Sequence, residues 1–287
     1  MKMSVIIPCY NAAGTISEQL EALVRQDWEQ PWEVIVADNG STDGTAHIVA
    51  DYQAKHPNIR LVDASGTQGP SFARNAGVEA AKGELVAFCD ADDLISKNWV
   101  RKIAEAIEEH GFVASRMGVH PSSDPQAAEL KKHRQTTGLI KYTYVPYLSH
   151  AGASGLGIRK CIHEEAGGFD ERFVYCEDCD YCWKVQLLGH PLQFASEAVI
   201  YVRHRETSAG QFRQGRNWGE YSVLLVKSYV PRGMPKPRLR DGLKQWRGLL
   251  KKIPKLRQPL HRQKFLWGLG YRVGHLIGTV RFRIVAL

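Results

Sequence analysis

Short apolar runs alternate with amphipathic segments along the first part of the chain. Mostly apolar runs at 4–8, 33–37, 59–62 and 85–89 predict buried strands, and apolar residues at helical spacing between them predict helices. Strands that are apolar on both faces and alternate with helices are typical of a parallel sheet covered on both sides. The pattern therefore predicts an α/β protein with a mainly parallel central sheet flanked by helices.

The second half of the chain is less regular. Residues 118–150 are polar and have no clear period, so they are expected to form a variable loop or a small subdomain. The apolar pattern then resumes and predicts three strands and two helices, at 152–158, 178–188, 192–195, 199–202 and 215–229. Three prolines make 231–238 the predicted linker, because proline interrupts regular structure.

The charge pattern supports a division of the chain near residue 230. The net charge is +8, but the segment from Pro231 to the end holds 15 Lys and Arg residues against one acid, and the preceding 230 residues hold 23 basic and 29 acidic residues. We therefore expect one domain over residues 1–230 and a basic helical extension over 239–287. A mildly acidic body with a strongly basic extension predicts contact with an anionic surface, either a membrane or a nucleic acid.

The extension has the pattern of an amphipathic helix. Apolar residues recur at helical spacing over 266–284, with Lys and Arg residues between them. Arg272 and His275 would make a membrane span costly, whereas Trp267 and Tyr271 suit the headgroup region. A helix lying on an anionic membrane surface is therefore favoured, and no nucleic-acid partner is expected. The alternative is a helix that packs on its own domain and leaves its basic face in water.

Three glycines in the extension follow one another at intervals of four residues: Gly270, Gly274 and Gly278. Residues at this spacing share one face of a helix. Because glycine has no side chain, this face would let another helix approach closely.

Cysteine usage and the N-terminal sequence bear on location. Six scattered cysteines are too few for a disulfide framework, which favours a reducing compartment. Cys176, Cys179 and Cys182 lack a fourth ligand at a suitable spacing, so we interpret them as semi-buried thiols rather than a metal cluster. The N-terminal apolar run is too short for a signal peptide, and no apolar stretch is long enough to span a bilayer. We expect a cytoplasmic protein whose basic extension rests on the inner face of the cell membrane.

Acidic side chains follow the predicted strands where these end: Asp38, Asp43, Asp90, Asp92 and Asp93. In parallel sheets, ligands bind outside the carboxyl ends of the strands. Several acids after an apolar strand repel one another unless a cation lies among them, and carboxylates completed by phosphate and water suit Mg²⁺ or Mn²⁺. An isolated acidic turn is explained equally well by turn formation or helix capping, since Asp favours both.

Several motifs, in the right order, resemble those of the family 2 glycosyltransferases with the GT-A fold. They are Ser4-Val5-Ile6-Ile7-Pro8-Cys9-Tyr10-Asn11, the segments 33–45 and 69–93, Gly167-Gly168-Phe169-Asp170-Glu171, and Glu177-Asp178-x-Asp180. The resemblance covers about residues 3–205. It implies a Rossmann-like GT-A fold in which residues of about 1–117 bind a nucleotide sugar and residues of about 151–230 bind the acceptor.

The resemblance implies roles for residues that would hold the nucleotide. Pro8, Tyr10 and Asn11 would line the nucleotide pocket. Asp38 would accept hydrogen bonds from the base, usually uracil in this family, and Asp43 lies on the same turn, where it could meet the base or ribose.

The resemblance also implies roles at the diphosphate. Arg74 would contact the diphosphate or the sugar, and Asp90 would contact the ribose or the sugar. Asp92 would bind a Mn²⁺ or Mg²⁺ ion that bridges both phosphates and neutralises the charge of the leaving group.

On the acceptor side, the resemblance makes Asp178 the base that deprotonates the acceptor hydroxyl. Glu177 and Asp180 would raise its pKa or orient it, because clustered carboxylates disfavour joint ionisation. The alternative is that Asp178 caps its helix. His204 would be a further metal or diphosphate ligand, and its alternative is a buried, hydrogen-bonded structural histidine.

The expected reaction is the inverting transfer of one sugar from a nucleotide-diphosphate sugar, a UDP-sugar above all, to a glycan or lipid-linked acceptor. Processive relatives carry Gln-x-x-Arg-Trp, whereas this chain has Gln214-Gly215-Arg216-Asn217-Trp218. A sugar nucleotidyltransferase would need a basic, Gly-rich N-terminal loop, and an NAD(P) oxidoreductase would need G-x-G-x-x-G, which residues 9–14 lack. A non-catalytic nucleotide-sugar-binding homologue remains an alternative, although every expected acid is present.

Overall fold

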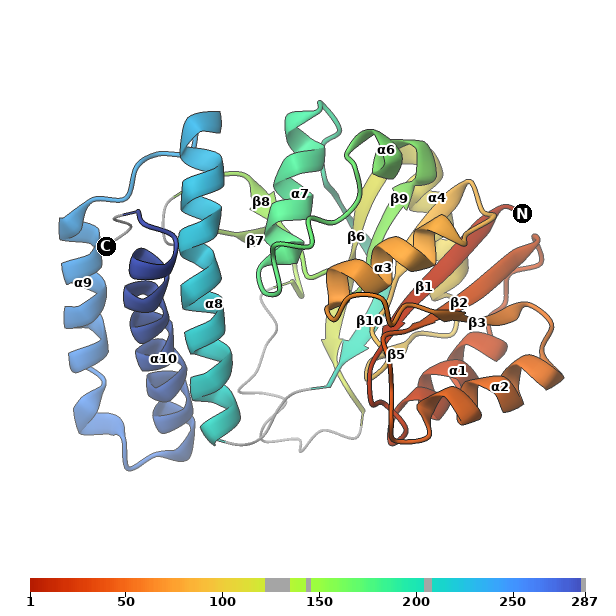
Figure 1. The fold of residues 1–287 in the computed structure, drawn as a ribbon, viewed down its shortest axis with the longest axis horizontal. Coiled ribbons are helices and arrows are strands. Elements are labelled where there is room, and N and C mark those ends of the chain that lie inside the picture. The colour runs from red at the N-terminus through yellow and green to blue at the C-terminus, as the bar shows by residue number, and fades with distance from the viewer. Residues whose placement is uncertain (122–134, 143–145, 204–207, 285–287) are drawn as a thin grey trace. The chain divides into compact units, whose positions relative to one another are not determined.

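The computed structural model describes residues 1–121, 135–142, 146–203 and 208–284 (Figure 1). His204 and parts of the irregular segment 118–150 lie outside these residues. The chain forms two compact units, one of residues Met1–Ile140 and Ser149–His204 and the other of Lys141–Leu148 and Arg205–Leu287. Each unit is described by itself.

The first unit is built on one eight-stranded sheet with the strand order β3-β2-β1-β4-β9-β6-β10-β5. The pairs β1–β2, β1–β4, β2–β3 and β6–β10 are parallel, and β9 and β5 pair antiparallel to their neighbours. The predicted mainly parallel sheet is confirmed. The strands are β1 (Met3–Cys9), β2 (Trp32–Asp38), β3 (Ile59–Asp63), β4 (Leu85–Phe88), β5 (Leu94–Ile95), β6 (Phe112–Val119), β9 (Leu156–Arg159) and β10 (Gln193–Val202). Two further short strands are β7 (Ile140–Lys141) and β8 (Ser149–His150).

Helices cover both faces of this sheet. Side chains of β1 and β2 such as Val5 and Val36 share one core with α1 (Ile16–Val24), α2 (Thr45–Lys55) and α4 (Trp99–His110). On the opposite face, α3 (Pro70–Glu79) packs through Ala73 against Ala37 of β2. The helices α6 (Lys160–Glu165) and α7 (Glu177–Leu187) complete the unit.

The parallel register brings three chain turns to the same edge of the sheet. Cys9 at the end of β1 lies beside Asp38 at the end of β2, and Ile6 of β1 lies beside Phe88 at the end of β4. The loops that follow β1, β2 and β4 therefore emerge together. All five acids that the sequence placed at strand ends belong to these loops.

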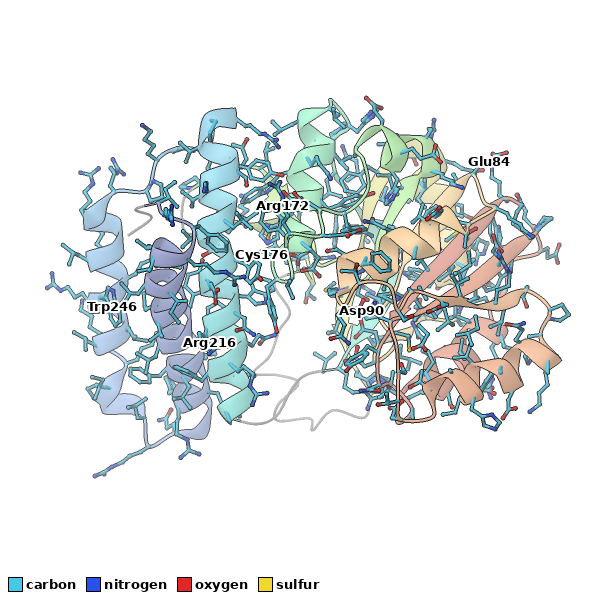
Figure 2. The ribbon with its side chains drawn as sticks, viewed as in Figure 1. Glu84, Asp90, Arg172, Cys176, Arg216 and Trp246 are labelled. Carbon is cyan, nitrogen blue, oxygen red and sulfur yellow. The ribbon has the colours of Figure 1, made fainter. Side chains whose placement is uncertain are left out.

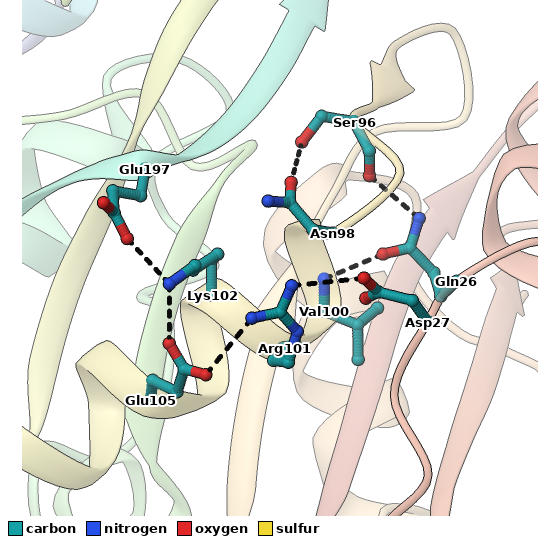
Figure 3. Close-up of polar contacts among 9 residues, drawn as sticks. All are labelled: Gln26, Asp27, Ser96, Asn98, Val100, Arg101, Lys102, Glu105 and Glu197. Carbon is teal, nitrogen blue, oxygen red and sulfur yellow. Dashed lines mark hydrogen bonds and ion pairs between the residues drawn. The ribbon is translucent and has the colours of Figure 1, made fainter.

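A polar network on the protein surface fixes α4 (Figure 3). The Gln26 side chain accepts a 2.9 Å hydrogen bond from the backbone N–H of Val100 and donates one of 2.9 Å to the Ser96 carbonyl. It thereby satisfies one of the backbone donors that the first turn of a helix leaves unpaired. Lys102 of the same helix pairs with Glu105 at 3.1 Å and with Glu197 of β10 at 2.8 Å.

Several predicted elements differ in extent from the observed ones, among them the strand expected at 152–158, which is β9 (Leu156–Arg159). The segments 192–195 and 199–202, expected as two strands, form the single strand β10, whose pairing with β6 shifts register between Ala195 and Val199. At this shift β10 has three residues between two that pair with adjacent residues of β6. The shift interrupts the alternation of side chains without ending the strand, which is why the pattern suggested two pieces. The helix expected at 215–229 begins earlier, at Ser208.

The second unit consists of helices: α8 (Ser208–Tyr229), the 3₁₀ turn η1 (Val230–Arg232), α9 (Leu239–Leu250), the 3₁₀ turn η2 (Ile253–Lys255) and α10 (Pro259–Arg281). The sequence grouped α8 with the domain 1–230, whereas α8 packs with α10 here. The proline-rich segment 231–238 connects α8 and α9 inside this unit. None of the helices in the described residues has a stretch long and apolar enough to cross a membrane.

The helices α8 and α10 approach closely through glycines. A Cβ atom added at Gly274 of α10 would lie 1.9 Å from the carbonyl oxygen of Arg216, and one added at Gly219 of α8 would lie 2.0 Å from that of Tyr271. Any side chain at these positions would therefore push the helices apart. The expectation that the glycines of the extension admit another helix is confirmed, and that helix is α8.

Candidate active site

The loops after β1 and β2 are hydrogen-bonded to each other. Asn11 has a positive φ of 49°, its backbone N–H donates to Ser41 Oγ at 2.9 Å, and its side-chain oxygen accepts the N–H of Thr42 at 2.8 Å. Asp38 accepts the backbone N–H of Ser41 at 3.2 Å and also its hydroxyl. These contacts hold the two loops as one rigid surface at the sheet edge.

The residues expected around the nucleotide lie on this surface. Pro8 is half-buried at the end of β1, and Tyr10 beside it is 53% exposed. Asp43 is exposed, and both of its carboxylate oxygens accept hydrogen bonds within the protein. One accepts the N–H of Ala13 at 3.0 Å, and the other accepts the N–H of Thr45 at 3.1 Å. Hydrogen bonds from the Thr45 hydroxyl and from Ala13 hold the pKa of Asp43 below its usual range.

The acidic turn after β4 places its three carboxylates in different environments. Asp92 is exposed, and the side chain of Asp90 is 37% exposed. Asp93 is buried and accepts hydrogen bonds from the Ser154 hydroxyl and, at 3.3 Å, from the backbone N–H of Arg203. Burial and the neighbouring charges of Asp90 and Asp92 raise the pKa of Asp93 well above its usual range. Asp93 therefore supports the turn, while the other two carboxylates can reach a ligand.

Arg74 of α3 joins the acidic turn to the start of α7. Its buried guanidinium donates to Asp90 Oδ1 at 2.9 Å and to Glu177 Oε1 at 3.1 Å, and it lies 5.5 Å from the ring centroid of Phe169. Arg74 was expected to contact the diphosphate or the sugar. The two ion pairs use only two of the five guanidinium N–H donors, and the buried Nε has no hydrogen-bond partner among the described residues, so the expected contact stays a prediction.

Asp178 lies in the first turn of α7 and is buried. Its Oδ1 accepts the backbone N–H of Cys179 at 2.8 Å. Burial, together with the negative charge of Glu177, raises the pKa of Asp178 to about 7. A carboxyl group that titrates near neutral pH suits a general base, because it takes up a proton more readily than an ordinary aspartate does.

The capping alternative for Asp178 does not match the observed helix start. The residue before the first turn is Cys176, whose φ of 61° is left-handed, and α7 begins at Glu177. Burial raises the pKa of Glu177, while the Arg74 guanidinium opposes this shift. Burial also raises the pKa of the thiols of Cys176, Cys179 and Cys182, so these cysteines are protonated at neutral pH.

Asn75, next to Arg74, fastens the loop that leads into α7. Its side chain donates to the Phe169 carbonyl at 2.9 Å and accepts the Phe169 N–H at 2.8 Å. Ser71 of the same helix donates to the carbonyl of Phe173 at 3.1 Å. A Cβ atom at Gly168 would lie 2.7 Å from the Asn75 oxygen, so this contact needs glycine there. Two motifs that are far apart in the sequence therefore form one structure.

Two residues whose hydrogen bonds hold the acidic turn in place were not identified from the sequence. The Ser154 hydroxyl accepts the backbone N–H of Asp90 at 3.1 Å and donates to Asp93, yet it lies in a Gly-rich segment with no motif of its own. Arg203 donates to the Asp92 carbonyl at 3.2 Å and to Glu18 at 2.6 Å. It therefore ties the acidic turn to α1.

The donor set suits a divalent cation that arrives with a diphosphate. The described residues contain no group of three or more His, Cys, Asp or Glu side chains that could hold a metal ion. His204 lies outside the described residues. Magnesium bound with a nucleotide takes only one or two carboxylates from the protein, and phosphates and water supply the other ligands. Asp92 and the partly exposed Asp90 can supply such oxygens.

Comparison with known proteins agrees with this geometry. The family model described as glycosyl transferase family 2 matches residues 4–152. Glycosyltransferase AglE of Haloferax volcanii is 26% identical over 228 residues, which are 78% of this chain and 74% of that protein. The poly(ribitol-phosphate) β-N-acetylglucosaminyltransferase TarS of Staphylococcus aureus is 40% identical over 215 residues, 72% of this chain. The matched region spans only 36% of TarS.

Solved structures show the same fold. Mannosyltransferase PcManGT from Pyrobaculum calidifontis, in complex with GDP-Man and Mn²⁺, aligns with a TM-score of 0.61 at 21% identity over 98% of this chain and 75% of that one. TarS in complex with UDP-GlcNAc aligns with a TM-score of 0.57 at 22% identity over 100% of this chain and 93% of that one. The GT-A fold expected from the motifs is confirmed. With a family model that covers more than half of its length, the chain belongs to glycosyl transferase family 2 and is a glycosyltransferase.

Proposed function

We propose that the protein is an inverting, metal-dependent glycosyltransferase that moves one sugar from a nucleotide-diphosphate sugar to a hydroxyl of a glycan or lipid-linked acceptor. The observation that carries this proposal is the link that Arg74 makes between the acidic turn and the start of α7, where Asp178 lies. The buried Arg74 guanidinium links Asp90 of that turn to Glu177, the residue next to Asp178. One site would thus supply a carboxylate for the donor and a base for the acceptor.

Related structures support a nucleotide-sugar donor. TarS was solved with UDP-GlcNAc and PcManGT with GDP-Man and Mn²⁺. Asp38 and Asn11, which lie on the joined loops after β1 and β2, would bind the base and ribose. We favour a UDP-sugar. TarS is named for its action on poly(ribitol phosphate), which supports a role in the synthesis of a cell-surface polysaccharide.

In the proposed reaction the acceptor hydroxyl loses its proton to the Asp178 carboxylate as its oxygen attacks C1 of the sugar. The new C1–O bond forms on the side of C1 opposite the diphosphate. The bond between C1 and the diphosphate breaks, and the diphosphate leaves with the electron pair of that bond. The configuration at C1 therefore inverts. Asp92 would hold Mn²⁺ or Mg²⁺, which neutralises the charge that develops on the leaving diphosphate. Asp90 would contact the donor ribose or sugar through its oxygen not paired with Arg74.

Thermal-shift measurements with UDP-, GDP- and dTDP-sugars and Mn²⁺ would identify the donor. Acceptors are then screened for release of a nucleoside diphosphate, and NMR of the product gives its anomeric configuration. Release of pyrophosphate instead would identify a nucleotidyltransferase. Donor binding without turnover on any acceptor would indicate a non-catalytic homologue, and a product with retained configuration would overturn the inverting mechanism.

Single substitutions, measured in the same transfer assay, test the roles of Asp178 and Asp92. Asp178→Asn should lose transfer and keep donor binding. Asp92→Asn should lose the stimulation by Mn²⁺ that follows treatment with a chelator. Asp51→Asn, on the exposed surface of α2, is the matched control and should keep both properties. Equal metal stimulation of Asp92→Asn and the unaltered enzyme would contradict the metal assignment.

A further inference from the structure

The helix α9 presents exposed leucines to solvent. Leu243 is 69% exposed and Leu250 is 59% exposed. They are seven residues apart, so they lie on the same face of the helix. Ile253, in the 3₁₀ turn η2 that follows, is 47% exposed. Apolar side chains of this size that gather at one place on a surface mark a site of interaction.

A basic stripe runs along the same helix. Its members are separated by four, three and four residues and therefore line up along one face: Arg240, Lys244, Arg247 and Lys251. All four are exposed. Around the helix from Leu243 and Leu250, Arg247 comes next and Arg240 follows it, so the stripe borders the leucines. The four basic residues and Leu243, Leu250 and Ile253 are called the α9 surface below.

The other side of α9 is already used. Leu249 is buried, and its Cδ1 would lie 3.1 Å from a Cβ added at Gly268 of α10. Trp246 is half-buried on the same helix (Figure 2). This packing fixes which face of α9 is covered, and it leaves the α9 surface in water.

The helix α10, which the sequence favoured for membrane contact, has much of its surface occupied. Its glycines face α8, Arg272 is buried with its guanidinium 4.7 Å from the ring centroid of Tyr271, and His275 is buried against Ser222 at 2.6 Å. Arg281 pairs with Glu220. Arg272 and Arg281 of α10 are thus engaged, whereas other residues of this helix are exposed: Arg262, Lys264, Leu276, Ile277 and Val280.

We propose that the α9 surface docks on an anionic lipid bilayer. An interfacial helix places apolar side chains at the boundary between headgroups and acyl chains and basic side chains among the headgroups, which is the arrangement found here. A nucleic acid would match the positive charge but would leave the leucines without an apolar partner. A second copy of the chain would bring like charges together, because the segment from Pro231 onward carries 15 basic residues and one acid.

Docking of this kind is independent of the proposed transfer reaction. It would keep the enzyme at the surface where a lipid-linked acceptor is found. Since α9 would lie along the membrane rather than across it, attachment would be reversible and would weaken as salt screens the basic side chains.

Sedimentation of the full-length protein with vesicles tests the proposal. Vesicles of phosphatidylcholine with phosphatidylglycerol should bind the protein, and pure phosphatidylcholine should bind it far less. Replacing the four basic residues with Gln should weaken binding by at least roughly a hundredfold, because each charge near an anionic surface contributes about fivefold. Leu243→Ser with Leu250→Ser and Ile253→Ser should also release the protein.

Two control variants test whether the α9 surface, rather than another part of the protein, binds the vesicles. Gln in place of Arg25, Lys55 and Lys97, which are exposed residues of the first unit, controls for loss of positive charge and should leave binding intact. Ser in place of Leu276, Ile277 and Val280 removes the exposed apolar residues of α10 and should have little effect. Melting curves show that each variant folds.

Several results would overturn the proposal. They are absence of binding to anionic vesicles, binding that survives both α9 variants, or loss of binding only in the α10 variant. Tight binding of the protein to duplex DNA with no binding to vesicles would assign the basic stripe to nucleic acid instead.

Discussion

Asn in place of Asp178 is expected to produce an enzyme that is inactive and more stable than the original at neutral pH. The substitution keeps the shape of the side chain and its hydrogen bond from Cys179, so it removes only the charge. The carboxylate is buried next to Glu177, and burial disfavours its ionised form. A base that the enzyme keeps at the expense of its own stability is typical of a functional site.

The pKa of Asp178 sets the size and the pH window of the effect. It is raised from 3.8 to about 7 in the folded protein. Between these values the folded state holds a proton that the unfolded chain releases, so stability falls as the pH rises from about 4 to about 7 and changes no further above that. A shift of about three units corresponds to about 4 kcal/mol. Asn, which does not ionise, should therefore gain at most about 4 kcal/mol over Asp178 at pH 8 and little at pH 4.

Urea unfolding of both proteins at pH 4 and pH 8 measures this difference. The same pKa predicts the rate, because only the ionised carboxylate accepts the acceptor proton. Transfer should be about tenfold slower at pH 6 than at pH 8, and Asp178→Asn should lower kcat by about 10²- to 10⁴-fold. Equal stability of the two proteins at both pH values, or a rate that does not change across neutral pH, would refute the assignment.

Three further substitutions test the framework of the site and the second unit. Arg74→Met leaves two carboxylates without their buried cation and should lower the free energy of unfolding by about 3–5 kcal/mol, measured by urea unfolding; an unchanged value would contradict the ion pairs. Gly274→Ala places a methyl group on the α8 backbone and should cost about 1–3 kcal/mol or more, while Gly248→Ala, with no atom within 4 Å of its new Cβ, should cost nothing. Lys102→Met removes the surface ion pairs of Figure 3 and should change stability by less than about 1 kcal/mol, a difference that added salt removes.

The sequence predicted those parts of the fold that depend on local pattern. Continuous apolar runs identified β1, β2, β3 and β4, and the rule that parallel strands end at one edge placed Asp38 and Asp90 together. These predictions succeed because strand burial and strand direction are visible in neighbouring residues. The same holds for the glycine face of α10, which a fixed spacing of four reveals.

The parts that were missed depend on contacts between distant residues. The partners of Arg74 are 16 and 103 positions away along the chain, so no local pattern shows that its guanidinium is buried between two carboxylates. Ser154 supports the acidic turn from 61 positions beyond Asp93. The place of α8 was missed for the same reason, because Gly219 matters only once α10 lies against it.

The charges of the site give a reason for a metal ion that does not depend on any motif. Five carboxylates gather around the acidic turn and the start of α7: Asp90, Asp92, Asp93, Glu177 and Asp178. The buried guanidinium of Arg74 contacts only two of them, and a donor diphosphate would add further negative charge.

Protonation of Asp93 and Asp178 relieves part of the repulsion among these carboxylates, as their raised pKa values indicate. Asp178 must lose its proton to act as a base, however, so the repulsion returns when the enzyme is ready to react. A divalent cation between Asp92 and the diphosphate would offset it at that stage, and this is why we expect the metal to matter more for catalysis at high pH than for the fold.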